Sequence, residues 1–373
     1  MLQFRRITTQ KRFIPQIDGL RFVAIASVVF FHIYAALENG AVPPPIPLDT
    51  DMPKHGVELF FAISGFILGV PFASRYLLHA PTVNLKSYFL RRLTRLEPPY
   101  FLALLAWAAM QRLVAHRPLS DMAPHLLAHS FYVQNLTFGA FVGAVNTVAW
   151  SLEIEIQFYI LVPLLSIMFA IGEARLRRIV ILLGMLLSGI LSIPLYRSTH
   201  LHYSILYYCG FFLAGFLLCD LYHTRGQWRQ SFMWDGLAIC LWPLVWLMGR
   251  NFGHVVLPFL IVVLYLSAFR GRISSAIFSH PIVTGIGGMC YTIYLFHFLV
   301  LYGVKHLTTP LHFKNNFWLY FLLQSCLIVP VILVFSGIFF VLVERPCMDR
   351  EWPKKLWHQA QGLLVPRTEQ PQL

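Results

Sequence analysis

Charged side chains are scarce in this chain, where Asp, Glu, Lys and Arg make up only 12% of the 373 residues. A typical water-soluble domain has about 25%. Acidic residues are the rarer kind, with 16 Asp and Glu against 29 Lys and Arg, while hydrophobic residues fill 57% of the chain. This balance excludes a soluble globular domain. It predicts an all-α, polytopic bundle of membrane helices.

The sequence also lacks the motifs of metal, redox and secretory chemistry. Its six cysteines form no Cys-x-x-C pair and share no metal-ligand spacing with histidine, so we expect buried thiols and no metal site. No small-residue cleavage site follows the first apolar stretch, as it would in a signal peptide, and we expect this stretch to remain as a membrane helix. No fixed-period or inverted repeat indicates a solenoid or a transporter.

Apolar stretches of about 20 residues, enough to cross a hydrocarbon core about 30 Å thick, recur along the chain. We expect ten transmembrane helices, at residues 19–38, 56–79, 97–115, 146–171, 177–196, 203–223, 232–249, 254–269, 287–306 and 316–343. Most Lys and Arg residues then lie in the tails and the even-to-odd loops, and cytoplasmic loops are the ones that collect them. Both termini are therefore predicted to be cytoplasmic, and the net charge of +13 requires no nucleic acid partner.

The predicted organisation is one multi-pass domain in the cytoplasmic (inner) membrane, flanked by two tails. We place a cytoplasmic N-terminal tail at 1–14, the membrane domain at 15–346 and a cytoplasmic C-terminal tail at 347–373. Two longer outer loops are candidate lids over an outward-facing opening: the proline-rich loop 38–56, and 116–145, which is expected to hold a short surface helix.

Several of these helices carry polar residues at depths where lipid disfavours them, and such residues mark function by default. Arg21 and His32 are eleven residues apart, so they share one helix face about 16 Å apart along the axis. By depth, His32, Ser64, Glu155 and His297 all fall near the middle of the membrane. We expect these four to converge. The alternative interpretation makes His32 a core histidine and Ser64 a packing position.

The fourth predicted helix has two polar stripes. Ser151, Glu155 and Tyr159 form one i, i+4 stripe, and Glu153 and Gln157 form another. Glu153 and Glu155 project about 200° apart, which excludes a paired-carboxylate site. One stripe is expected to face a cavity and the other a helix interface.

The cytoplasmic end of the third helix carries three arginines, Arg91, Arg92 and Arg95. Ordinary anchoring by positive residues would explain them. The planar guanidinium fork also suits phosphate, so the alternative is an anion site for a phosphate-rich cytosolic donor.

Six stretches together resemble the acyltransferase-3 family of bacterial-type integral-membrane O-acyltransferases. They are IDGLRFVAIASVVFFHIY, HGVELFFAISGFILG, YFLRRLTRLEPPYFL, WSLEIEIQFYILVP, YTIYLFHFLV and VERPCM, in the family's order and approximate spacing. The resemblance covers about residues 14–347.

The family's patterns fall on particular residues of this chain. Its basic residue, followed after ten intervening residues by a histidine, falls on Arg21 and His32. Its R-x-x-R falls on Arg92 and Arg95, and the glutamate of its W-S-L-x-x-E motif falls on Glu155.

Three glutamates depart from the family's patterns. Glu153 stands where a small residue is more common, Glu97 adds an acid after the arginines, and Glu58 replaces the usual aspartate. Glu153 and Glu97 add acidic groups near the proposed sites, so the family's donor-binding residues apply less directly to this chain. The change at Glu58 is conservative.

The resemblance implies about ten helices, an acyl-CoA donor with acetyl-CoA expected, and transfer of a short acyl group to a hydroxyl of a sugar, glycan, lipid-linked glycan or macrolide. On this hypothesis the arginines of the third helix bind the donor's phosphates and Arg21 lines the donor channel. His32 is the general base.

Three further roles complete the hypothesis. Glu155 orients His32 or the acceptor, and His297 is a second proton carrier or an oxyanion donor. A covalent acyl-histidine or an acyl-enzyme on Ser64 is the alternative to direct transfer.

Two rival classes use the same residues. A proton-coupled transporter or flippase would use the intramembrane His, Glu and Arg as a relay. A non-catalytic scaffold is the third interpretation, although a scaffold would gain nothing from buried charge.

Overall fold

The computed structural model describes residues 13–38, 55–224, 228–248, 250–308, 311, 316–349 and 351–352. Every regular element within these residues is helical, which confirms the all-α prediction. Most of both predicted tails, 1–14 and 347–373, and most of the loop 38–56 lie outside the described residues.

All ten predicted apolar stretches form helices. They correspond to α1 (Pro15–Glu38), α2 (Gly56–Leu77), α3 (Leu85–Leu113), α6 (Trp150–Leu165), α7 (Ala174–Leu195), α8 (Ile205–Thr224), α9 (Phe232–Leu247), α10 (Arg250–Arg270), α13 (Cys290–Thr308) and α14 (Phe317–Phe339). By length and composition, seven spans in the described chain can cross a membrane. The bent pair of α12 (Pro281–Gly288) and α13 is an eighth if it is one span. The protein is thus a polytopic membrane bundle.

Shorter helices fill the connections between these spans. The loop 116–145 contains α4 (Leu119–Ser130) and α5 (Gln134–Thr137), which confirms the predicted short helix. The remaining short elements are α11 (Arg272–Phe278), α15 (Arg345–Cys347), the 3₁₀ turns Ser166–Ala170 and Leu201–Tyr203, and a π-helical turn at Phe340–Glu344.

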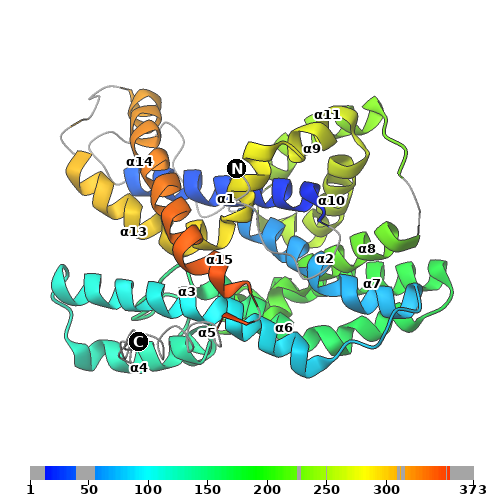
Figure 1. Ribbon diagram of the computed structural model, residues 1–373, viewed down its shortest axis with the longest axis horizontal. Coiled ribbons are helices and arrows are strands. Elements are labelled where there is room, and N and C mark those ends of the chain that lie inside the picture. The colour runs from blue at the N-terminus through cyan, green and yellow to red at the C-terminus, as the bar shows by residue number, and fades with distance from the viewer. Residues whose placement is uncertain are drawn as a thin grey trace, which may run out of the picture.

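Helices α1 and α2 lie between two groups of helices (Figure 1). On one side α13 and α14 pack against each other and against α1, and on the other side α7, α8 and α10 pack together, with α8 and α10 also touching α2. Together, the first two helices therefore contact both groups: α1 contacts α13 and α14, and α2 contacts α8 and α10. Residues of α1 and α2 are therefore placed to line a site between the groups.

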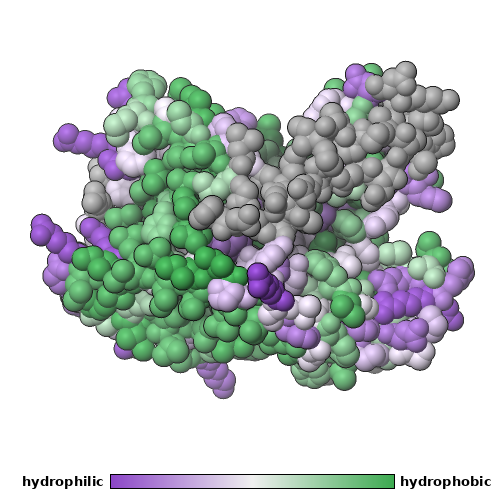
Figure 2. All heavy atoms as spheres, turned by 180° about the vertical axis from the view of Figure 1, so that it is seen from behind, coloured by the Kyte–Doolittle hydropathy of each residue, from purple (hydrophilic) through white to green (hydrophobic). Residues whose placement is uncertain are grey.

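The outer surface of the bundle is apolar. Figure 2 shows a broad hydrophobic surface with hydrophilic residues gathered toward its edges. Leu183, Leu187 and Ile190 on α7 are about half exposed. Such a large exposed apolar area is unusual for a soluble protein and fits a surface that faces lipid.

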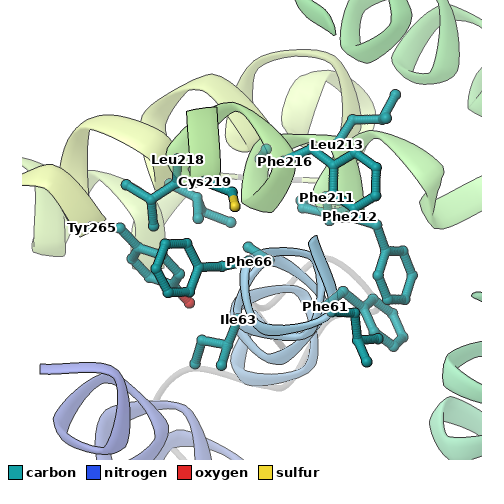
Figure 3. Close-up of a cluster of buried hydrophobic side chains, with 14 of the residues drawn as sticks. Phe61, Ile63, Phe66, Phe211, Phe212, Leu213, Phe216, Leu218, Cys219 and Tyr265 are labelled. Atoms are coloured by element: carbon teal, nitrogen blue, oxygen red, sulfur yellow. The ribbon is translucent and has the colours of Figure 1, made fainter. Parts of the chain in front are cut away.

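Helices α2 and α8 pack through interleaved aromatic rings (Figure 3). Phe61 stacks on Phe212 with ring centroids 4.7 Å apart, and Phe158 of α6 stacks on the same ring at 4.0 Å. Gly65 allows this approach, because a Cβ there would lie 2.1 Å from the carbonyl oxygen of Phe212. In membranes, small residues let helix backbones come this close.

We expect the substitution Gly65→Val to destabilise the bundle by about 3 kcal/mol, at the upper end of overpacking effects. The obstacle is the α8 backbone, which cannot rotate away. Thermal unfolding in detergent measures the effect. Gly303→Val on α13 is the matched control, because nothing lies within 4 Å of a Cβ at that position; equal melting temperatures for the two variants would refute the packing argument.

A sharp bend separates α12 from α13. Their axes differ by 70° across a short break at Met289. Just before it, Gly287 lies so close to α1 that a Cβ would be 1.8 Å from the carbonyl oxygen of Asp18. This contact docks the end of α12 on α1, just before α13 begins.

Candidate active site

A cavity of about 390 Å³, called the inner cavity because its arginines lie at the helix ends predicted to be cytoplasmic, is lined by all four arginines that were assigned to the donor. Arg21 reaches it from α1, and Arg91, Arg92 and Arg95 reach it from the start of α3. These side chains come from segments about 70 residues apart in sequence. The structure therefore brings together the predicted donor-binding set.

The arginines are held by neighbouring side chains. Arg21 forms an ion pair with Asp18 at 2.6 Å. Arg92 lies over the ring of Tyr88, 4.0 Å from its centroid, a cation–π contact, and donates to the backbone carbonyl of the same residue at 3.2 Å. The cavity wall has four arginines and two carboxylates, so its net charge is positive and it attracts anions.

Deeper in the same cavity, Ser64, Glu155 and Tyr159 form a hydrogen-bonded group. The Ser64 hydroxyl donates to Oε1 of Glu155 at 2.6 Å, and the Tyr159 hydroxyl donates to the same oxygen at 2.7 Å. All three residues line the cavity together with Ser151. One stripe of α6 thus faces a cavity, as predicted.

The second stripe of α6 faces other parts of the protein. Glu153 is fully buried and accepts a hydrogen bond from the backbone N–H of Asn135 at 2.8 Å. The side chain of Gln157 accepts one from the backbone N–H of Ile205. These contacts confirm that the second stripe lies at an interface.

His32 and His297 form a direct pair across α1 and α13. Nδ1 of His32 is 2.9 Å from Nε2 of His297. Nδ1 of His297 is 2.9 Å from the carbonyl oxygen of Ile293 and 2.8 Å from that of Tyr294.

These contacts fix the tautomers. A carbonyl can only accept, so Nδ1 of His297 carries a proton, and in the neutral ring Nε2 is then an acceptor. His32 consequently donates through Nδ1, which leaves Nε2 of His32 as its basic nitrogen.

His32 opens into a second, outer cavity of about 360 Å³. Aromatic side chains form most of its wall, among them Trp150, Tyr203 and Tyr208. His55 and Glu58, at the start of α2, are also in the wall.

The two cavities share a wall. Ser151, Tyr294 and Val57 line both of them. The Tyr294 hydroxyl donates to the carbonyl of Val148 and lies 2.9 Å from the Ser151 hydroxyl, which therefore donates to Tyr294. The arginine-lined cavity and the one that holds His32 therefore adjoin at Ser151, Tyr294 and Val57.

The expected convergence of four midplane residues at one site is wrong in detail. His32 and His297 lie together at the outer cavity, whereas Ser64 and Glu155 lie together in the inner one. Depth along a helix fixes how far a residue lies across the membrane, but not which neighbour it faces. His32 contacts His297, and Glu155 contacts Ser64 and Tyr159 instead of His32.

Sequence reasoning passed over Tyr294. It lies three residues before His297, so it shares a face of α13 with that histidine, and this spacing was the available signal.

As for metals, no group of three or more His, Cys, Asp or Glu side chains in the described residues could hold an ion.

Comparison with known proteins gives one family for nearly the whole membrane part. A family model described as an acyltransferase domain matches residues 14–337. OatA of Listeria monocytogenes, named a peptidoglycan O-acetyltransferase, is 24% identical over 90% of this chain and 56% of its own length. YrhL of Bacillus subtilis, provisionally named a peptidoglycan O-acetyltransferase, is 26% identical over 91% of this chain and 55% of its own length.

A provisionally named O-acetyltransferase of Staphylococcus aureus is 28% identical over 42% of this chain and 25% of its own length. The chain thus spans between a quarter and just over half of the length of these curated relatives. No solved structure matches the chain significantly.

Proposed function

Since the chain belongs to this acyltransferase family, we propose that it is a membrane O-acetyltransferase, moving an acetyl group from acetyl-CoA to a hydroxyl group of a glycan. The observation that carries the proposal is the shared wall. It brings a positively charged cavity suited to a phosphate-rich donor next to a histidine pair suited to a hydroxyl acceptor.

The donor binds in the inner cavity. Arg91, Arg92 and Arg95 take its phosphates, because guanidinium groups form charge-assisted hydrogen bonds with phosphate. Arg21 lines the way inward. The thioester then reaches the wall formed by Ser151 and Tyr294.

The acceptor binds in the outer cavity beside His32. Nε2 of His32 takes the proton of the acceptor hydroxyl as its oxygen attacks the thioester carbonyl. The carbon–sulfur bond breaks, and the protonated His32 returns the proton to the leaving CoA sulfur. His297 holds His32 in the required tautomer throughout.

Peptidoglycan is one acceptor that the named relatives suggest, and lipid-linked glycans and hydroxylated natural products are others. Mass analysis of cell-wall glycans, lipid-linked glycans and small metabolites from cells with and without the gene identifies the acceptor. The proposal expects one class to lose an acetyl ester when the gene is absent. Unchanged acetylation in all classes would contradict it.

We expect Ser64 to act without a covalent intermediate. Its hydroxyl donates to Glu155 in the inner cavity and not to His32, so the proposed base does not activate Ser64 as a nucleophile. Ser64→Ala should lower turnover less than about tenfold, far below the range for a missing proton-transfer group. Intact-protein mass after incubation with acetyl-CoA tests the point. An acetylated peptide containing Ser64 that disappears on adding acceptor would establish the covalent route instead.

A further inference from the structure

The outer cavity contains a buried carboxylate that the proposed chemistry does not use. Glu58 is 8% exposed and lines the cavity with His32. Its Oε1 faces Nδ1 of His55 at 3.7 Å. Its Oε2 is buried and has no hydrogen-bond partner among the described residues.

His55 lies between the Glu58 carboxylate and the Met248 carbonyl. Nε2 of His55 lies 3.1 Å from the carbonyl of Met248, so this nitrogen carries a proton. His55 stands just before the α2 span. Burial lowers its pKa, but the neighbouring Glu58 carboxylate and the Met248 carbonyl outweigh burial and raise the pKa above 6.5. When His55 is protonated, its Nδ1–H faces Oε1 of Glu58 at a distance of 3.7 Å.

An unsatisfied carboxylate oxygen is costly inside a protein, because it has lost its water without gaining a donor. A ligand that brings a hydroxyl or amide N–H to Oε2 removes this cost. Sites of this kind reject analogues that lack the donor, since the polar group is then left without a partner again.

The other walls of the cavity suit the flat face of a ring. Trp150 and Tyr203 meet edge to face with centroids 5.2 Å apart, and Tyr208 lies 5.8 Å from Trp150. Aromatic faces pack well against the C–H face of a sugar ring, and a few placed polar groups then fix its orientation, as in most small-molecule pockets.

We propose that Glu58 is the specificity residue of the acceptor site and binds, through Oε2, a hydroxyl or amide of a neutral pyranose other than the hydroxyl presented to His32. This inference rests on the proposed function. The carboxylate favours neutral sugars and disfavours anionic ones, since the described wall of the outer cavity has no arginine or lysine to balance a second negative charge.

The test measures binding by calorimetry on purified protein in detergent. The neutral probe is N,N′,N″-triacetylchitotriose, and its anionic counterpart is trigalacturonate. The variants are Glu58→Gln, which keeps the shape without the charge, and Glu58→Asp, which keeps the charge. Glu97→Gln is the matched control, because Glu97 is another glutamate outside both cavities, hydrogen-bonded by Tyr132.

We expect Glu58→Gln to weaken the binding of triacetylchitotriose about 10- to 100-fold, the range for hydrogen bonds to a charged group. The same variant should bind trigalacturonate more tightly than the wild type does. Glu58→Asp should recover part of the neutral binding. The control Glu97→Gln should bind both probes and acetyl-CoA as the wild type does, because Glu97 lies outside both cavities.

Two results would overturn the inference: a wild-type protein that does not bind triacetylchitotriose, or a Glu58→Gln variant that binds both probes as the wild type does. The outcomes separate this inference from the proposed function. Glu58-dependent sugar binding without any acetyl-CoA consumption would contradict the proposed enzyme function alone. Acetyl-CoA consumption with unchanged sugar binding in Glu58→Gln would contradict only the role of Glu58.

Discussion

Replacing His32 with alanine is expected to lower acyl transfer roughly a thousandfold, the effect of losing a positioned general base. The hydroxyl of the acceptor would then have no group to take its proton as it attacks the thioester. Donor binding should persist, because the arginines lie in the other cavity. The measurement is release of CoA thiol with acceptor present, alongside acetyl-CoA affinity.

Replacing His297 should lower acyl transfer as well, but by less than replacing His32. Replacing it with phenylalanine removes the nitrogen that accepts from Nδ1 of His32, so both tautomers of His32 become accessible. We expect a loss of about 10- to 100-fold, the range for groups that orient a reacting residue, and a shifted pH profile. The control is His306→Ala, since His306 is an exposed histidine near the end of the same helix.

Undiminished acyl transfer in folded His32→Ala protein would refute the assignment of His32 as the general base.

Removing Arg92 and Arg95 together should raise the KM for acetyl-CoA about a hundredfold, because each guanidinium contributes charge-assisted hydrogen bonds to phosphate. S-acetylpantetheine carries the same thioester without the phosphorylated adenosine part of CoA. Its KM should hardly change in the double variant. Measuring both donors therefore separates phosphate binding from damage to the reaction centre.

The matched control for this pair is Arg112→Ala, an exposed arginine in the last turn of α3. It should leave both KM values unchanged. Lysine replacements at positions 92 and 95 should recover only part of the affinity, since an ammonium group lacks the planar fork of arginine. A loss of equal size for both donors would show that these arginines act on something other than the phosphates.

The sequence predicted the features that depend on local periodicity. Runs of apolar residues located all ten helices, and the spacing within α6 separated the cavity stripe of Glu155 from the buried stripe of Glu153. Both follow from the 3.6-residue turn and the cost of polar groups in lipid. The arginines were also predictable as a group, because three of them lie within one helical turn and a half.

The sequence did not predict how separate helices meet. His32 and His297 are 265 residues apart, and their contact depends on the docking of α12 against α1 at Gly287 and on the 70° bend that follows. The place of Tyr294 in the shared wall depends on the packing of α13 against α6, where its hydroxyl meets that of Ser151. The division into two cavities likewise depends on side-chain packing between helices, which a hydropathy pattern does not specify.

Fewer helices of the described chain are long and apolar enough to span a membrane than the ten predicted, for a related reason. The short α9 and the charged, proline-containing α3 fall outside the seven helices of the described chain that are long and apolar enough to span. α3 carries the arginines of the inner cavity and buries part of its polar surface inside the bundle. A helix that lines a charged cavity need not be apolar all round.

The most direct test of the account is thioester turnover by the purified protein in detergent, where no ion gradient exists. The protein is given acetyl-CoA and the acceptor identified from cells, and free CoA and acetyl ester are measured together. The account predicts equal amounts of the two products in the wild type and loss of both in His32→Ala. Intact acetyl-CoA in detergent, combined with gradient-driven movement of a substrate across liposomes, would contradict it and establish a transporter.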